Sequence, residues 1–128
     1  MSDVFPIEVR NLVKRYGQFT AVDGIDFDVA SGECVALLGP NGAGKTTTIN
    51  MLCTLLRPTS GQARVAGLDV IKEKNDVRRT IGLVFQETTL DDYLTAEQNI
   101  FFHALAYGVH SVVRKQSTKE LLTLMELW

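Results

Sequence analysis

The amino-acid sequence predicts an α/β fold, in which an antiparallel β-subdomain adjoins part of a parallel core sheet, and three observations support this. Residues 34–38 and 81–85 are short continuous apolar runs of the kind that a buried parallel strand needs. A glycine-rich segment at 39–46 joins the first run to apolar residues at helical spacing. Strict alternation at 25–29 predicts an earlier strand with one face in water.

Length and composition limit the functions that need to be considered. The 128 residues predict one domain at most, and the net charge of −2 gives no indication of nucleic-acid binding. We expect no signal peptide, and no apolar run approaches the roughly 20 residues of a membrane-spanning helix. Cys34 and Cys53 are interpreted as core residues rather than a disulfide or metal pair. These features favour the cytoplasm.

The first region, 1–32, is predicted to form the antiparallel β-subdomain. Alternating residues over 7–16 indicate strands, and Gly17 and Gln18 form a turn. The strand at 25–29 follows, and a turn at 31–32 leads into the first core strand.

The second region, 33–86, is predicted to be the core that carries the glycine-rich loop. Its first helix holds apolar residues from Ile49 to Leu56 and is stopped by the breaker cluster at 57–61. A short strand at 62–66 and a surface helix at 75–79 come next. The core strand at 81–85 then ends at Gln86.

The third region, 87–128, is predicted to begin a helical subdomain. Thr95 and Gln98 form a capping box, and its helix runs to about Tyr107 with Gly108 as a C-terminal stop. A second capping box is predicted at 117–120. The helix after it is predicted to have an apolar face formed by Leu121, Leu124, Met125 and Trp128.

That last helix has no evident stop signal. No Gly or Pro follows it, and Glu126 places an anion where the helix dipole disfavours one. We therefore expect a truncated chain.

The loop itself indicates phosphate binding, because Gly39 and Gly44 are separated by four residues and followed by a lysine and a hydroxyl. Glycines let the backbone approach phosphate oxygens, and the helix N-terminus favours an anion. Lys45 can reach the outer phosphates, and Thr46 can offer its hydroxyl to Mg²⁺. The predicted phosphate-binding residues are Gly39, Pro40, Asn41, Gly42, Ala43, Gly44, Lys45, Thr46 and Thr47.

With this loop, an aromatic upstream at Tyr16 and Gln86 closing an apolar run, the chain closely resembles the ATP-binding domain of ABC transporters. Residues 54–61 and 94–100 are also very like that family. The resemblance covers essentially the whole chain and is greatest to the ATPase subunits of daunorubicin-type, multidrug-resistance exporters. It implies a P-loop NTPase fold and identifies the loop as the family's Walker A motif.

The resemblance also implies roles that the residues alone do not establish. Tyr16 would stack on the adenine of ATP, and Val22 would touch the adenine or the ribose. Gln86 would reach Mg²⁺ and the attacking water, so the implied metal contacts are Thr46 and Gln86. The stretch 90–94 would meet a membrane-spanning subunit. Without the resemblance, Tyr16 reads as sheet packing and Gln86 as a polar strand end.

Several parts of the family's catalytic site have no counterpart in this sequence. The LSGGQ-type signature, the apolar strand that ends in Asp followed by Glu (Walker B), and the switch His do not occur. The segment 60–62 and the residues Glu87, His103 and His110 do not match those positions. We therefore expect the isolated chain to bind Mg-ATP weakly or not at all, without turnover. We also expect it to self-associate through exposed sheet edges and apolar faces.

The function that the resemblance implies is that of an ATP-binding fragment of an exporter. The full-length protein would pair with a membrane-spanning permease, would form a homodimer of ATP-binding domains, and would lie at the cytoplasmic face of the membrane. Three alternatives stay open. They are a soluble ABC-type ATPase with a regulatory role, a small P-loop kinase, and an inactive structural fragment.

Overall fold

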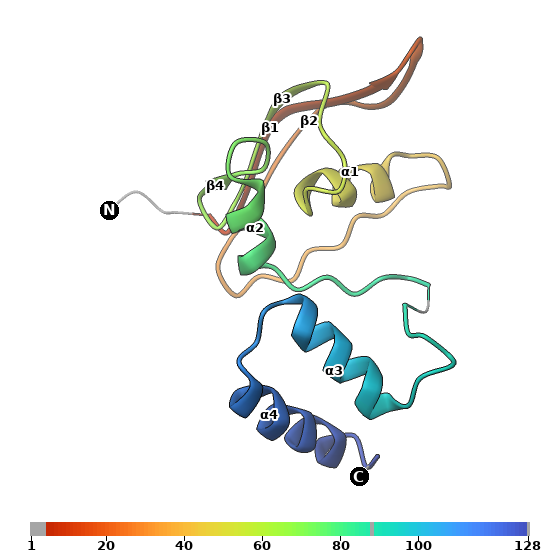
Figure 1. Cartoon of the computed structure of the whole chain (residues 1–128). Coiled ribbons are helices and arrows are strands. Elements are labelled where there is room, and N and C mark those ends of the chain that lie inside the picture. Colours follow the sequence, from red (N-terminus) through yellow and green to blue (C-terminus); the bar gives the residue numbers. More distant parts are fainter. Residues whose placement is uncertain (1–4, 88, 128) are drawn as a thin grey trace. The chain divides into compact units, whose positions relative to one another are not determined.

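A computed structural model of this protein describes residues 5–87 and 89–127, so the predicted contribution of Trp128 to a helical face lies outside the described residues. The chain divides into two compact units, Met1–Leu83 and Val84–Trp128 (Figure 1). No helix in the described part of the chain combines the length and the apolar character that crossing a bilayer requires.

The first unit is built on a four-stranded antiparallel sheet. Its strands are β1 (Ile7–Tyr16), β2 (Phe19–Val29), β3 (Ser60–Val65) and β4 (Leu68–Asp69), in the spatial order β2-β1-β3-β4 (Figure 1). The prediction of an antiparallel sheet is therefore confirmed, although β3 and β4 lie outside the predicted region 1–32. The sequence pattern did not reveal β4, nor that residues 19–24 continue the strand predicted at 25–29.

Two tight turns organise this sheet. Tyr16 pairs with Phe19 across the predicted turn, where Gly17 has a φ of 58°. Between β3 and β4 the two loop residues, Ala66 and Gly67, have φ values of 52° and 78°, as a type I′ turn requires. Ala-Gly is a much weaker hairpin signal than Asn-Gly, which is why sequence reasoning missed this second hairpin.

Asp69 closes the turn that follows β4. Its Oδ1 accepts hydrogen bonds from the backbone N–H groups of Lys72 and Ile71, both at 2.9 Å. These bonds, that of Lys72 foremost, hold the pKa of the Asp69 carboxyl below its usual range. The carboxylate form therefore stabilises this turn.

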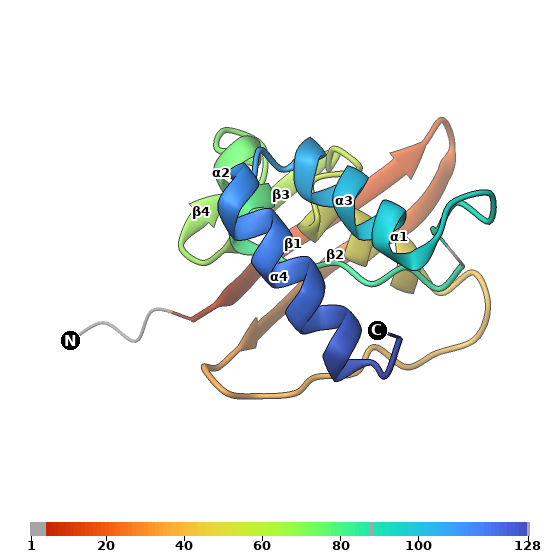
Figure 2. The same cartoon turned by 60° about the horizontal axis from the view of Figure 1, so that its bottom comes forward.

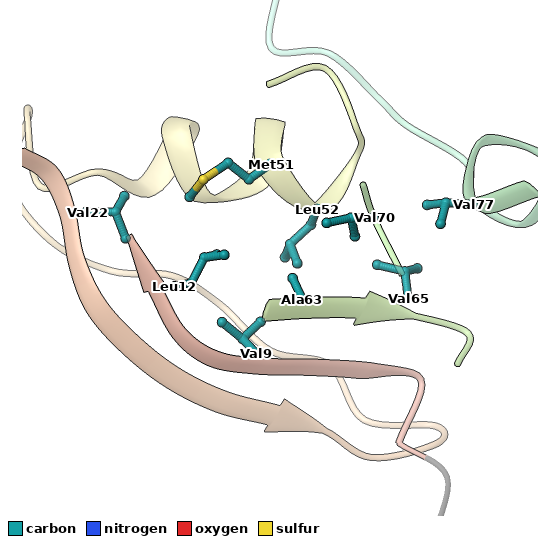
Figure 3. Packing of buried hydrophobic residues seen from close by; sticks show 9 residues of the cluster. All are labelled: Val9, Leu12, Val22, Met51, Leu52, Ala63, Val65, Val70 and Val77. Carbon is teal, nitrogen blue, oxygen red and sulfur yellow. The ribbon is translucent and has the colours of Figure 1, made fainter. Parts of the chain in front are cut away.

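Two helices, α1 (Lys45–Leu52) and α2 (Lys74–Thr80), pack with the sheet around one hydrophobic core. Figure 3 shows the side chains of α1 and of the strands pointing into the space between them. Burial of such aliphatic side chains contributes about 1.5–3 kcal/mol each. The buried members are Val9, Leu12, Val22, Met51, Leu52, Ala63, Val65, Val70 and Val77.

Helix α1 ends earlier than the apolar spacing predicts, because the chain turns left-handed at Thr54, whose φ is 62°. The N–H of Leu55 donates to the carbonyl of Asn50 at 2.8 Å, which is the closing bond of a Schellman motif. A β-branched residue is unfavourable in this conformation. Arg78 of α2 compensates, since its Nε donates to Thr54 Oγ1 at 2.7 Å and its Nη2 to the Thr54 carbonyl at 3.1 Å.

The two predicted core strands, 34–38 and 81–85, form neither strand nor helix in the described residues. Their apolar side chains are largely uncovered, with Leu38 90% and Val84 95% exposed. A parallel strand depends on hydrogen bonds from neighbouring strands, and no described strand pairs with either segment. The exposed runs agree with the predicted self-association, which stays a prediction.

The core interpretation of the cysteines is wrong for Cys34, which is exposed on the unpaired segment 34–38. Cys53, beside α1, is half-buried, and this burial raises the pKa of its thiol.

The second unit contains two helices, α3 (Ala96–Ala106) and α4 (Ser111–Leu124), which lie side by side (Figure 2). The capping box at the start of α3 is confirmed. Thr95 Oγ1 accepts from the Gln98 N–H at 3.2 Å, and Gln98 Oε1 accepts from the Thr95 N–H at 2.8 Å. Gly108, with a φ of 69°, ends the helix as predicted.

The predictions for α4 are wrong at both ends. The helix begins at Ser111, so the predicted capping box at 117–120 lies inside it, and Thr118 is buried. The helix also has a stop. Glu126 adopts a φ of 58°, and the Leu127 N–H donates to the Leu122 carbonyl at 2.8 Å. A residue other than glycine therefore forms this left-handed turn, which is why the sequence pattern did not predict it.

Candidate functional site

The loop at 39–44 runs directly into helix α1, as the sequence predicts. Gly44 is the N-cap of α1 and is left-handed, with φ 84° and ψ 6°, and it offers no side-chain cap. The first N–H groups of any α-helix lack intrahelical acceptors and lie at the positive end of the helix dipole. The start of α1 is therefore complementary to an anion such as phosphate.

Gly44 is required by packing as well as by its backbone conformation. A Cβ added at this position would lie 2.3 Å from the Ala21 carbonyl oxygen and 3.0 Å from Val22 Cγ2. The end of the loop is thus seated directly on strand β2. Gly42 differs, since a Cβ there would meet nothing within 4 Å, and only its φ of 85° favours glycine.

Lys45 folds back over the loop that precedes it. Its Nζ donates to the carbonyls of Gly39 and Pro40, both at 2.7 Å. Within the loop, the Ala43 N–H donates to the Pro40 carbonyl at 3.2 Å. The loop therefore holds a cation near its beginning and an uncapped helix N-terminus at its end, and both favour bound negative charge.

The three threonines that open α1 have different environments. Thr46 is exposed and Thr47 is half-buried, so both remain available to a ligand. Thr48 is buried, and its Oγ1 donates to the Gly44 carbonyl at 2.9 Å. Thr48 is thus a structural residue that holds the N-cap, a role that the run of threonines did not reveal.

Tyr16 lies at the end of β1, close to the loop. It pairs with Phe19, which precedes Ala21 by two residues, or about 7 Å along the strand. Because Ala21 is the residue against which Gly44 packs, this register brings Tyr16 near the end of the loop. The hairpin tip and the loop also extend to the same side of the first unit in Figures 1 and 2. The Tyr16 side chain is 50% exposed, as a stacking surface needs to be.

Val22 lies beneath the loop rather than beside it. It is only 5% exposed and points into the core with Met51 of α1, as Figure 3 shows. Its position supports the end of the loop through the contact at Gly44. The contact with a base that the resemblance implies stays a prediction.

Gln86 and the segment 90–94 belong to the second unit, so their predicted roles also stay predictions. Gln86 is exposed, as are Leu90 and Tyr93, whereas Leu94 is half-buried. The segment is tied to α3 by the buried Asn99, whose Oδ1 accepts from the Asp91 N–H at 2.9 Å. Among residues 5–87 and 89–127 no group of three His, Cys, Asp or Glu side chains is placed to hold a metal ion.

Comparisons with known proteins give one consistent result. Residues 22–128 match the sequence model of the family described as ABC transporter. The probable multidrug ABC transporter ATP-binding protein YbhF of Escherichia coli K12 is 45% identical over 113 residues, 88% of this chain and 19% of YbhF. The daunorubicin/doxorubicin resistance ATP-binding protein DrrA of Streptomyces peucetius is 44% identical over 116 residues, 91% of this chain and 35% of DrrA.

Solved structures agree with these sequence relatives. An ATP-binding subunit of an ABC transporter is 30% identical, with a TM-score of 0.79, over 97% of this chain and 51% of that one. The protein cbiO1 from Clostridium perfringens, part of the ABC transporter complex cbiONQ, is 26% identical, with a TM-score of 0.77, over 93% of this chain and 49% of that one. The chain thus spans about half the length of these structures and less of the sequence relatives.

Proposed function

Because this chain belongs to the ABC transporter family, we propose that its loop at 39–47 binds the phosphates of Mg-ATP. The observation that carries the proposal is the geometry of Lys45 and Gly44. A cation lies over the start of the loop, and a left-handed glycine at its end leads into the uncapped first turn of α1. The same family match favours this function over that of a small P-loop kinase.

Each remaining site residue has a role in this proposal. Thr46 offers its hydroxyl to Mg²⁺, an ion that prefers oxygen ligands and keeps several waters. Gln86 contributes to the same ion and orients the attacking water in the longer protein. Tyr16 stacks on the adenine, because a flat aromatic face can hold a base by π-contact. Val22 contacts the adenine or the ribose at most through its small exposed part and otherwise supports the loop.

The longer protein would couple ATP hydrolysis to the export of drug-like compounds. The support for this part is the identity with the multidrug and daunorubicin resistance proteins. Such a protein would dock, through 90–94, on a membrane-spanning permease at the cytoplasmic face, and two ATP-binding domains would pair. Because the sequence pattern indicates no signature, Walker B or switch His, we propose that this chain alone binds ATP weakly, without hydrolysing it.

A titration of the purified chain with Mg-ATP tests the loop proposal. Amide NMR spectra are recorded to millimolar nucleotide, because we expect weak binding. The expected shifts are confined to the first unit, centred on 39–48, and Lys45→Ala should abolish them. Lys115→Ala is the matched control, since it removes one exposed lysine from the second unit. Equal shifts in the Lys45→Ala variant, or steady phosphate release by the chain, would contradict the proposal.

A further inference from the structure

We propose that Lys14 is a positioning residue for the nucleotide base, which holds the Tyr16 ring so that one face remains for stacking. This inference rests on the proposed function, in which Tyr16 receives the adenine. It assigns a role to a residue that lies outside the phosphate-binding loop.

The first observation is the contact between the two side chains. Lys14 and Tyr16 are two residues apart on β1, so they project from the same face of the sheet. Lys14 Nζ lies over the Tyr16 ring, 5.0 Å from its centroid. This distance is within the roughly 6 Å at which a cation is attracted to the face of an aromatic ring.

The second observation is that the ammonium is anchored elsewhere. Lys14 Nζ also donates to the Arg57 carbonyl at 2.7 Å. The segment that carries this carbonyl is itself fixed to β1 by Thr59. The Thr59 N–H donates to the Val13 carbonyl at 2.9 Å, and Thr59 Oγ1 accepts from the Arg15 N–H at 2.9 Å. The position of the Lys14 ammonium is therefore fixed by the segment 57–59 and not by the turn at the tip of the hairpin.

These contacts have a consequence for base binding. Tyr16 lies next to the hairpin turn and is half exposed, so its ring would otherwise sample several rotamers. Ordering a side chain on binding costs free energy, because rotamer entropy is lost. A cation fixed on one face reduces that cost and directs the base to the opposite face.

The test separates binding of the base from binding of the phosphates. The two ligands are Mg-ATP and magnesium tripolyphosphate, which lacks the ribose and the adenine. The ratio of their affinities measures the contribution of the nucleoside. We expect Lys14→Met to lower this ratio about twofold to fivefold, the range of an exposed cation–π contact, and to leave tripolyphosphate binding unchanged. Lys14→Arg keeps the cation and should preserve the ratio.

Two further variants make the outcomes decisive. Arg15→Met removes a neighbouring exposed cation from the opposite face of β1 and should change neither affinity. Tyr16→Ala should lower the ratio at least as far as Lys14→Met. A ratio unaffected by Tyr16→Ala would overturn the proposed stacking, and with it the role of Lys14. A ratio lowered by Tyr16→Ala but unaffected by Lys14→Met would overturn the role of Lys14 alone.

Two other outcomes also contradict the inference. If Lys14→Met lowered the affinities for Mg-ATP and magnesium tripolyphosphate equally, the effect of the substitution would be a general structural one and not the loss of a positioning contact. Absence of binding of both ligands by the unmodified chain would overturn the proposed site itself. The contact can also be checked without ligand, since the ring current of Tyr16 should shift the Lys14 side-chain methylene signals, and Tyr16→Leu should remove that shift.

Discussion

Replacing Gly44 by alanine should destabilise the first unit far more than the same change at Gly42. Both glycines are left-handed, with φ values of 84° and 85°, so alanine is strained at either position. Only at Gly44 does the added methyl group meet other atoms, 2.3 Å from the Ala21 carbonyl oxygen and 3.0 Å from Val22 Cγ2. The pair of variants therefore separates backbone strain from steric overlap.

The magnitude follows from these two terms. Left-handed strain costs about 1–2 kcal/mol for a residue with a Cβ, and this applies to both variants. Relief of the contact with Ala21 requires β2 and the loop to separate by about 1 Å. Overpacking of this kind adds about 1–3 kcal/mol. We thus expect losses in the free energy of unfolding of about 2–5 kcal/mol for Gly44→Ala and about 1–2 kcal/mol for Gly42→Ala.

The assay is equilibrium urea unfolding without nucleotide, followed through amide NMR signals of β1 and β2. These signals report on the first unit, whereas circular dichroism would average it with α3 and α4. The free energy at each urea concentration extrapolates linearly to water. Equal losses for the two variants would refute the reasoning, because they would show that the contact with β2 contributes nothing.

Three further predictions concern turns of the first unit, each measured by the same urea unfolding. Ala66→Asn should raise the free energy of unfolding by about 0.5–1 kcal/mol, because asparagine tolerates positive φ better in a type I′ turn, and a loss would count against that turn. Arg78→Met should lower it by about 1–3 kcal/mol, since two hydrogen bonds to Thr54 disappear, and an unchanged value would show that they do not support the end of α1. Asp69→Ala should destabilise the chain at pH 7 but not near pH 2. Backbone hydrogen bonds, foremost that from Lys72, lower the pKa of Asp69 in the folded state. The contribution of Asp69 to stability is therefore present above its pKa in the unfolded chain and is lost as the pH falls through its pKa in the folded chain. An equal effect of Asp69→Ala at both pH values would contradict this.

Features with strong local determinants could be predicted from the sequence. The loop from Gly39 into α1, the hairpin at Gly17 and the capping box at Thr95 each depend on residues within a few positions. The core strands could not be predicted in this way. An apolar run such as 34–38 specifies a strand only when other strands lie beside it, and the described residues provide none.

Other differences arise where one residue type has two uses. Ser and Thr at 117–118 fit a capping box, yet they occupy the interior of α4, because the helix begins earlier at Ser111. Thr54 is left-handed within the Schellman motif that ends α1, and Arg78, distant in sequence, donates hydrogen bonds to both of its oxygen atoms. In the candidate site, the loop follows from the sequence pattern and the proposed role of Tyr16 from the family resemblance. The proposed role of Lys14 and the bond of Thr48 to Gly44 depend on three-dimensional contacts.

The two carbonyl bonds of Lys45 determine how an anion would enter the loop. A lysine side chain carries about 2 kcal/mol of rotamer entropy. Because these two bonds already order the Lys45 side chain in the folded protein, that entropy is lost during folding and not when a ligand binds. An arriving phosphate must replace two neutral acceptors with its own charged oxygens, so the step is an exchange of partners. The donor is ionised in both cases, but only a phosphate oxygen adds the attraction between opposite charges, so the exchange favours polyanions over weakly charged solutes.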